Sequence, residues 1–168
     1  MKKILILSDT HRKHNLILKA IGLEAPFDAL IHCGDIEGNI DDILPDVEYP
    51  VTVVRGNMDN SPWLFYEDDE IVEMKGHRIF ITHGHRYGVN YGLQELMAAA
   101  KEAACDVVCY GHLHVPEILQ EEDLLILNPG SLAKPRQASV KPTYIVLTMD
   151  DAGRIDAEIK YLPGYLLG

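Results

Sequence analysis

Five apolar segments of this 168-residue chain each end in residue types that bind metal ions, and this regularity constrains the fold more than any other feature. The segment KILILS at 3–8 is followed by Asp-Thr-His, ALIHC by Gly-Asp, VTVVR by Gly-Asn, RIFIT by His-Gly-His, and VVCY by Gly-His-Leu-His. Short apolar segments bounded by turn residues are typical of buried strands. In open α/β sheets, functional groups gather beyond the carboxyl ends of the strands, so we expect these residues to share one pocket.

The candidate ligands combine carboxylate, amide and imidazole groups without any thiolate: Asp9, His11, Asp35, Asn57, His83, His112 and His114. Such a set suits Mn, Fe, Zn, Co or Ni better than Ca or Mg. In extended chain, residues two apart face the same way, so Asp9 with His11, and His112 with His114, are each expected to hold one ion. The set is too large for one tetrahedral site. It fits two ions that share a carboxylate, which is the usual arrangement for displacement at phosphorus.

Hydrophobic periodicity and turn residues predict the order of elements along the chain. Strands are expected at 3–8, 28–33, 51–55 and 107–110, and helices at 14–23, 39–44 and 92–104. Hairpins are expected at 71–82 and 143–161, with two short strands within 117–127 and a tight turn at 128–131. The alternating first half indicates parallel strands, and the hairpins of the second half indicate antiparallel pairing. The sequence therefore predicts one α/β domain, residues 1–168, with mixed sheets.

Composition is that of an ordinary globular domain, with 47% hydrophobic and 24% charged residues. No apolar stretch is long enough for a membrane helix, and the run after Lys3 is too short for a secretory signal, so a cytoplasmic protein is expected. The net charge of −11 repels nucleic acids and anionic membranes, and neither is expected as a partner. Cys33, Cys105 and Cys109 lie in or beside apolar segments and are interpreted as buried thiols.

The motifs Asp-Thr-His, Gly-Asn-Met-Asp, Thr-His-Gly-His, Gly-His-Leu-His and Asn-Pro-Gly-Ser occur in an order and at spacings that resemble the calcineurin-like metallophosphoesterases. Within that family the chain is similar to the small bacterial and archaeal phosphodiesterases of the YfcE type, over essentially its whole length. The resemblance implies a four-layer α/β/β/α sandwich of two mixed sheets, with the Asn-Pro-Gly-Ser motif near the site. It also implies a small phosphodiester substrate, with phosphomonoesters as a further class. Assembly into a homodimer or a homotetramer is left open.

The resemblance assigns a role to each ligand. One divalent ion would be held by Asp9, His11 and His114, the other by Asn57, His83 and His112, and Asp35 would bridge them. Mn²⁺ is the expected metal, with Ni²⁺, Co²⁺, Fe²⁺, Zn²⁺ and Mg²⁺ as alternatives. A hydroxide between the ions would attack phosphorus, and Asn57 would also touch a phosphate oxygen. Asp59 would lie outside the ligand shell and orient a neighbouring histidine.

Met58 departs from a pattern common in the family, in which a histidine at this position is proposed to protonate the leaving group. A thioether cannot act as a general acid. His85, two residues after the expected ligand His83, is the candidate proton donor by its position. We therefore expect a preference for substrates whose leaving group departs easily.

The remaining histidines and two arginines have simpler interpretations. His14 and His77 are expected on the surface, and His32, inside an apolar strand, is expected to be buried or just behind the ligands. Arg55 and Arg136 are candidates for contacts with a substrate phosphate or with another subunit, or for surface salt bridges.

A phosphodiesterase is the favoured function. The alternatives are an interaction scaffold of the same fold, like the retromer subunit, and a metal-sensing protein without turnover. A scaffold would tolerate losses among the ligands, whereas every expected ligand position here carries a competent residue.

Overall fold

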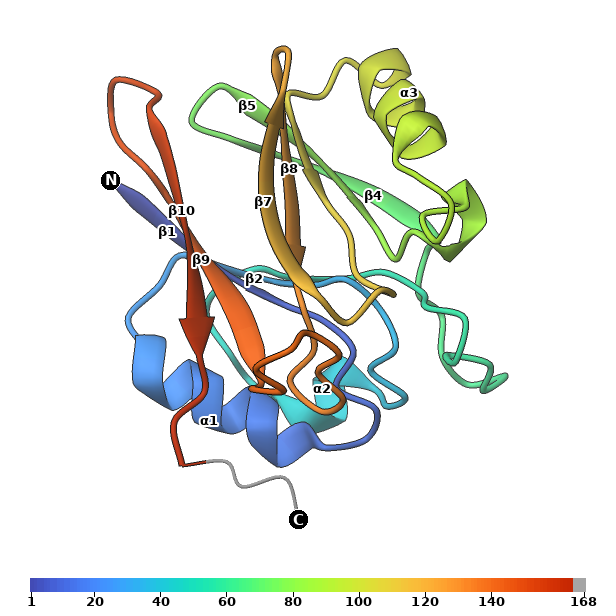
Figure 1. Ribbon diagram of the computed structural model, residues 1–168. Helices are drawn as coiled ribbons and strands as arrows, with labels where there is room; N and C mark the ends of the chain where they lie inside the picture. The colour runs from blue at the N-terminus through green and yellow to red at the C-terminus, as the bar shows by residue number, and fades with distance from the viewer. Residues whose placement is uncertain (165–168) are drawn as a thin grey trace.

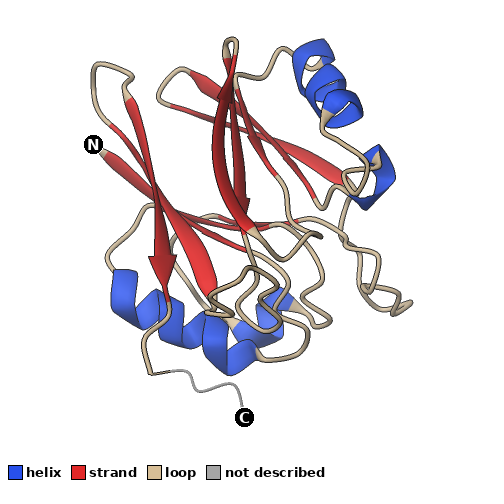
Figure 2. Cartoon of the chain, in the orientation of Figure 1, coloured by secondary structure: helices blue, strands red, loops and turns tan. Residues whose placement is uncertain are grey.

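Two five-stranded mixed sheets face each other in the computed structural model, which describes residues 1–164, and helices cover their outer faces (Figures 1 and 2). The expected four-layer α/β/β/α sandwich is confirmed. The end of the predicted domain, residues 165–168, lies outside the described residues. Within the described part of the chain, no helix is long and apolar enough to cross a membrane.

The first sheet has the strand order β10-β9-β1-β2-β3. Its strands are β1 (Lys2–Leu7), β2 (Ala29–His32), β3 (Val51–Val53), β9 (Thr143–Met149) and β10 (Ile155–Tyr161). The first three run parallel, and β9 pairs antiparallel with both β1 and β10. Helices α1 (His14–Glu24) and α2 (Ile40–Ile43) pack on its outer face, where α1 buries Leu16, Ile17 and Ala20.

The second sheet has the order β4-β5-β6-β8-β7. Its strands are β4 (Asp69–Met74), β5 (His77–Thr82), β6 (Val107–Cys109), β7 (Pro116–Glu121) and β8 (Leu124–Pro129). The central β5, β6 and β8 run parallel, and the edge strands β4 and β7 are antiparallel. Helix α3 (Gln94–Glu102) covers the outer face through Leu96 and Ala100, and the short 3₁₀ helix η1 (His85–Tyr87) follows β5.

Alternation along β1 explains how its apolar run serves two cores. Ile4 and Ile6 face the second sheet and share one buried cluster with Ile79 and Ile81 of β5. Leu5 and the next alternate residue of β1 face α1 and α2 instead. A strand buried on both faces needs a continuous apolar sequence, which is what KILIL supplies.

Four expectations about local structure are wrong. The turn expected at 128–131 begins later, because β8 continues through Pro129 and the chain turns at Gly130, where φ is +73°. The strand expected from Ile71 begins at Asp69, and the helix expected at 92–104 spans only 94–102. His77 is half-buried rather than a surface residue, because its ring bonds the Asp106 carboxylate and the carbonyl of Gly153.

The core between the sheets gives a test with a matched control in one hairpin. Ile79→Ala removes a fully buried side chain and is expected to lower the free energy of unfolding by about 2–5 kcal/mol. Ile71→Ala on the neighbouring β4 removes a side chain that is 40% exposed, and is expected to cost about 1 kcal/mol or less. Urea denaturation of both variants measures the difference, and equal losses would contradict the assignment of the core.

Candidate metal centre

The carboxyl ends of strands from both sheets meet at one edge of the sandwich. Asp9, Asp35 and Asn57 follow β1, β2 and β3, while His83 follows β5 and His112 follows β6. The amide of His112 donates to Asp9 Oδ2 at 3.1 Å, which ties the loop of one sheet to the loop of the other. The expectation that the strand ends share one pocket is therefore confirmed for these loops.

One group of ligand atoms is formed by Asp9, His11 and His114, whose atoms lie within 4.8 Å of one another. Asp9 Oδ1 lies 2.9 Å from His114 Nε2 and 3.8 Å from His11 Nε2. The two histidine Nε2 atoms are 3.4 Å apart. These are the residues expected to hold one ion.

A second group is formed by Asp9, Asp35 and His83. His83 Nε2 lies 3.3 Å from Asp35 Oδ2 and 3.9 Å from Asp9 Oδ1. Asn57 Oδ1 lies 3.0 Å from His83 Nε2 and 3.1 Å from His112 Nδ1, so the amide and the remaining imidazole join this group. All the expected ligands are thus brought together, with Asp9 common to both groups.

Asp35 occupies a position between the two groups. Its Oδ2 lies 3.9 Å from His11 Nε2 on one side and 3.3 Å from His83 Nε2 on the other. Its Oδ1 accepts the amide of Met58 at 2.8 Å, which holds the carboxylate in this orientation. This placement suits a bridging ligand, and the bridging role stays a prediction.

The chemistry of the site fits divalent cations. Asp9 is fully buried, and its Oδ1 accepts no hydrogen bond in the described structure, although it points into the cluster. A buried carboxylate oxygen that faces imidazole nitrogens without accepting a hydrogen bond is costly, and a cation bound between the imidazoles and carboxylates would satisfy it. Oxygen and nitrogen ligands in this mixture suit first-row transition metals.

Outer hydrogen bonds fix the orientation of three histidine rings. His83 Nδ1 donates to the carbonyl of Cys33 at 2.6 Å, and His114 Nδ1 to that of Lys134 at 2.7 Å. His11 Nδ1 faces Glu37 Oε2 at 2.9 Å. Each bond leaves Nε2 as the nitrogen directed at the site.

The ring of His112 is reversed. Its Nε2 faces Asn90 Oδ1 at 2.9 Å, and its Nδ1 is directed at the ligand group. The sequence interpretation missed Glu37 and Asn90 in these orienting roles. Neither lies in a motif that predicts contact with a histidine, because the loops that carry them have no regular period.

Asp59 does not orient a histidine, which corrects the role expected for it. Its carboxylate accepts the amides of Asp35 and Gly56 at 2.8 Å and of Glu37 at 2.7 Å. A carboxylate that accepts three backbone amides fixes the loop after β2 against the loop after β3. Asp59 therefore positions the ligand Asp35 through the backbone.

Five ligand residues have left-handed backbone conformations, which residues other than glycine adopt infrequently. Their φ angles are 53° for Asp9, 42° for His11, 55° for Asp35, 68° for His112 and 60° for His114. The expectation that ligand pairs converge because the chain is extended is therefore wrong. The pairs converge through tight turns, and such strain is typically stored at functional sites.

Two glycines allow the loops to approach the ligands closely. A Cβ atom at Gly56 would lie 2.1 Å from Asp35 Oδ1 and 2.3 Å from its amide nitrogen. A Cβ atom at Gly111 would lie 2.1 Å from Ser8 Oγ and 2.7 Å from Asp9 Oδ2. Both positions exclude any larger residue on steric grounds, because the contacts are with fixed groups at the base of the site.

The buried carboxylates are kept ionised by the imidazoles around them. Burial alone would raise the pKa of Asp9, but His114 and His83 lower it below its usual value. Burial opposes ionisation of Asp35 as well, and His83 with the amide of Met58 lowers its pKa to about 2. Negative charge is therefore concentrated where cations are expected.

A cavity of about 200 Å³ opens over the ligands. Besides His11, Asp35 and other ligands, its wall includes Met58, Lys134 and Arg136. The expectation that Arg136 contacts a substrate phosphate is consistent with this position, whereas Lys134 was missed because nothing in its sequence context marks it.

His85 lies beside the ligands but does not line this cavity. Its ring centroid is 5.3 Å from that of His83 and 6.1 Å from that of His112, and its buried Nδ1 has no hydrogen-bond partner in the described structure. Its role as a proton donor stays a prediction. His32 is fully buried and faces Thr10 Oγ1 at 3.0 Å, and burial lowers its pKa to about 3, so it is a neutral structural residue.

The Asn-Pro-Gly-Ser segment lies near the site, as the resemblance implied, and supports it through hydrogen bonds. Asn128 donates to the carbonyl of Gly111 at 3.0 Å, and Ser131 Oγ donates to the carbonyl of Asp9 at 2.7 Å. Both bonds hold backbone beside a ligand.

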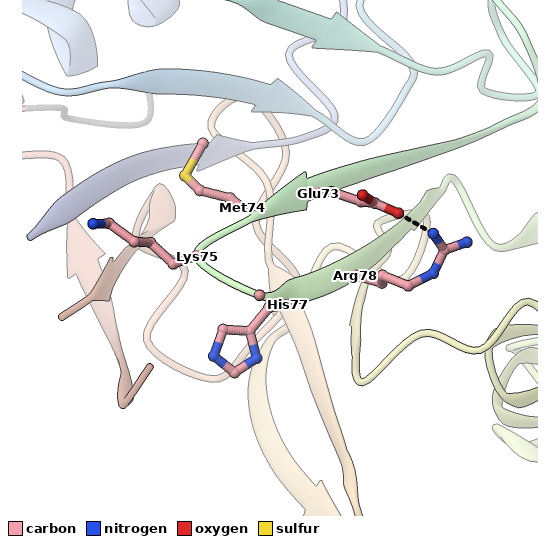
Figure 3. A pocket seen from close by; sticks show the side chains of 6 residues that line it. Glu73, Met74, Lys75, His77 and Arg78 are labelled. Atoms are coloured by element: carbon pink, nitrogen blue, oxygen red, sulfur yellow. Dashed lines mark hydrogen bonds and ion pairs between the residues drawn. The ribbon is translucent and has the colours of Figure 1, made fainter. Parts of the chain in front are cut away.

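A separate cavity of about 320 Å³ lies at the turn between β4 and β5 and is shown in Figure 3. It is lined by residues 73–78, with the Glu73–Arg78 ion pair on one side and Lys75 and His77 on the other. His77 begins β5, whereas the ligand His83 follows its end. The cavity is therefore at the end of the strand away from the metal ligands.

Comparison with known proteins identifies the family. The Calcineurin-like phosphoesterase superfamily domain matches residues 1–152. The chain belongs to this family. It is 34% identical over 151 residues to the probable metallophosphoesterase YsnB of Bacillus subtilis, covering 88% of this chain and 85% of the relative. It is 32% identical over 143 residues to the phosphodiesterase MJ0936 of Methanocaldococcus jannaschii, covering 76% and 82% of the two chains.

Solved structures share the architecture. A conserved uncharacterized protein of Streptococcus pneumoniae, a predicted phosphoesterase, superposes with a TM-score of 0.81 at 30% identity, over 97% of this chain and 94% of that one. Vps29 of Entamoeba histolytica, crystallised with Zn²⁺, superposes with a TM-score of 0.72 at 19% identity, over 95% and 99%. At that identity, the likeness to Vps29 shows the fold alone.

The orienting contact of Glu37 gives a test of the metal centre. Glu37→Ala frees the His11 ring and is expected to weaken Mn²⁺ binding by about 10- to 100-fold, as loss of such outer partners does elsewhere. Glu48→Ala, at an exposed position, is the matched control and is expected to leave affinity unchanged. Isothermal titration calorimetry measures both, and equal affinities in the two variants would contradict the role of Glu37.

Proposed function

We propose that the protein is a phosphodiesterase that uses two divalent metal ions, Mn²⁺ in preference to Ni²⁺, Co²⁺, Fe²⁺, Zn²⁺ or Mg²⁺. Membership of the phosphoesterase family supports the class of reaction. The observation that carries the proposal is the pair of ligand groups that share Asp9, with Asp35 between them. Two ions held by adjoining ligand groups would be the usual device for in-line displacement at phosphorus.

The candidate ligands fall into two sets, one for each ion. Asp9, His11 and His114 would hold one ion, and Asn57, His83 and His112 the other, with Asp35 between. When bound, the ions supply an activated water and neutralise charge on the phosphoryl oxygens. Lys134 and Arg136, on the wall of the cavity, would attract the anionic substrate into a protein whose net charge is −11.

The substrate expected here is a small phosphodiester with a good leaving group. Met58 lines the cavity but cannot protonate the leaving group, since a thioether has no proton to donate. His85 is the remaining candidate donor, and it lies behind His83 and His112 rather than on the cavity wall. Diesters with acidic alcohols or phenols as leaving groups need no such donor.

An interaction scaffold of the same fold is the alternative from another class. The retained ligand set argues against it, because each outer partner and each close-packed glycine serves the geometry of the ligands. A scaffold would have no use for a buried Asp9 whose Oδ1 faces His114 Nε2 without accepting a hydrogen bond.

Turnover tests the proposal directly. Protein supplied with Mn²⁺ is expected to hydrolyse bis-p-nitrophenyl phosphate, and excess chelator is expected to abolish release of p-nitrophenolate. Absorbance at the wavelength of p-nitrophenolate measures the rate. No turnover with Mn²⁺, Ni²⁺, Co²⁺, Zn²⁺ or Mg²⁺ would contradict the proposed enzyme and favour the scaffold.

The placement of Asp35 between the groups gives a second test. Asp35→Asn keeps an oxygen for the amide of Met58 but removes the charge, and is expected to weaken binding of both ions by at least about tenfold. Asp123→Asn, at an exposed turn, is the matched control and is expected to retain both ions. Metal analysis after dialysis gives the stoichiometry, and two full equivalents in Asp35→Asn would refute the bridging role.

A further inference from the structure

A second, larger cavity lies beside the metal centre. It has a volume of about 520 Å³, and its wall includes Arg12, Asn39, Met58, Asn60 and Leu64. Met58 also lines the cavity over the ligands, so the two cavities adjoin at this side chain. The volume falls within the range of sites that bind small organic molecules.

Chain connectivity fixes the larger cavity next to the ligands. Arg12 directly follows His11, and Gly38 and Asn39 follow Asp35 in the loop after β2. Met58 directly follows Asn57 in the long loop between β3 and β4, which leaves the sheets in Figure 1. The loops that supply the metal ligands therefore continue into the walls of this cavity.

The lining is neutral and able to form hydrogen bonds. Arg12 Nε lies 3.3 Å from Glu37 Oε1, so the cation on the wall is offset by a carboxylate that also lines it. The exposed amide of Asn60 has no hydrogen-bond partner within residues 1–164, and Asn39 uses only its oxygen, for the amide of Asp41. Met58 and Leu64 add apolar surface.

We propose that this cavity binds the second ester group of the substrate, the one that stays on phosphorus when the leaving group departs, and that this group is a neutral, ring-sized alcohol such as a nucleoside or a sugar. This inference rests on the proposed phosphodiesterase function. Free amides match the mixed donors and acceptors of a base or a sugar, and the absence of net charge disfavours an anionic group. Met58 then serves as a packing surface between phosphate and ring at the position where a histidine is common in the family.

The second cavity also favours a diester over a monoester as substrate. A monoester has no group to place in this cavity, and a diester gains the contact along with hydrolysis at the metal centre. Binding energy from a part of the substrate remote from the reacting bond is available to orient the phosphate.

The test compares substrates that share one leaving group. Thymidine 5′-(p-nitrophenyl phosphate), glucose 6-(p-nitrophenyl phosphate) and methyl p-nitrophenyl phosphate each react by attack of water on phosphorus with departure of p-nitrophenolate. The products that remain are thymidine 5′-phosphate, glucose 6-phosphate and methyl phosphate. With Mn²⁺, kcat/KM for the thymidine or the glucose ester is expected to exceed that for the methyl ester by about tenfold or more, and the better of the two identifies the ring.

Asn60→Trp places a large side chain in the cavity and is expected to lower the ratio of ring ester to methyl ester about tenfold. Gln120→Trp introduces the same residue at an exposed position on β7 and is expected to leave the ratio at the wild-type value. Asn60→Ala is the milder companion and is expected to lower the ratio in the same direction. The inhibition constants of thymidine 5′-phosphate and of inorganic phosphate, each measured as a competitive inhibitor, give a separate readout of binding in the same cavity.

The outcomes separate this inference from the proposed function. Hydrolysis of all three esters at equal kcat/KM, or an unchanged ratio in Asn60→Trp, overturns the inference and leaves the phosphodiesterase intact. Equal loss on all esters in Asn60→Trp also overturns it, since that result reports general damage to the metal centre. No hydrolysis of any ester overturns the proposed function together with the inference.

Discussion

Burial of one face of β1 against one face of β5 joins two sheets that are hydrogen-bonded separately. Ile4 and Ile6 share a fully buried cluster with Ile79 and Ile81, and within residues 1–164 no main-chain ladder crosses between the sheets. The metal ligands depend on this packing, because three of the loops come from the first sheet and two from the second. A shift of one sheet over the other would separate Asp9 from His83 without breaking either ladder.

Several contacts within the site are between ligand residues and backbone groups. Carbonyls orient His83 and His114, backbone amides fix Asp35 and Asp59, and the serine of Asn-Pro-Gly-Ser holds the carbonyl of Asp9. Backbone partners are tied to the fold and do not swing away as side chains do. They offset the strain of left-handed conformations at the ligands, which is why so many non-glycine residues adopt them here.

The strand ends and the candidate ligands that gather beyond them could be predicted from sequence, because apolar strands and residue types that bind metals stand next to each other in it. Resemblance to a family supplied the layers and the pairing of ligands with ions. Local geometry was less accessible. The left-handed turns at Asp9 and His112 replace the expected extended chain, and Asp59 binds amides instead of a histidine. Glu37, Asn90 and Lys134 come from irregular loops, where side-chain direction is set by tertiary contacts that no periodicity encodes.

The buried Asp9 Oδ1, which accepts no hydrogen bond in the described structure, has a consequence for the stability of the protein in a cell. A cation that binds the folded state and not the unfolded chain stabilises the fold in proportion to the logarithm of its free concentration. The fraction of molecules that unfold, and are then cleared by proteases, would thus rise as the metal supply falls. The abundance of the protein, and not only any activity that needs the metal, would then depend on the metal supply of the cell.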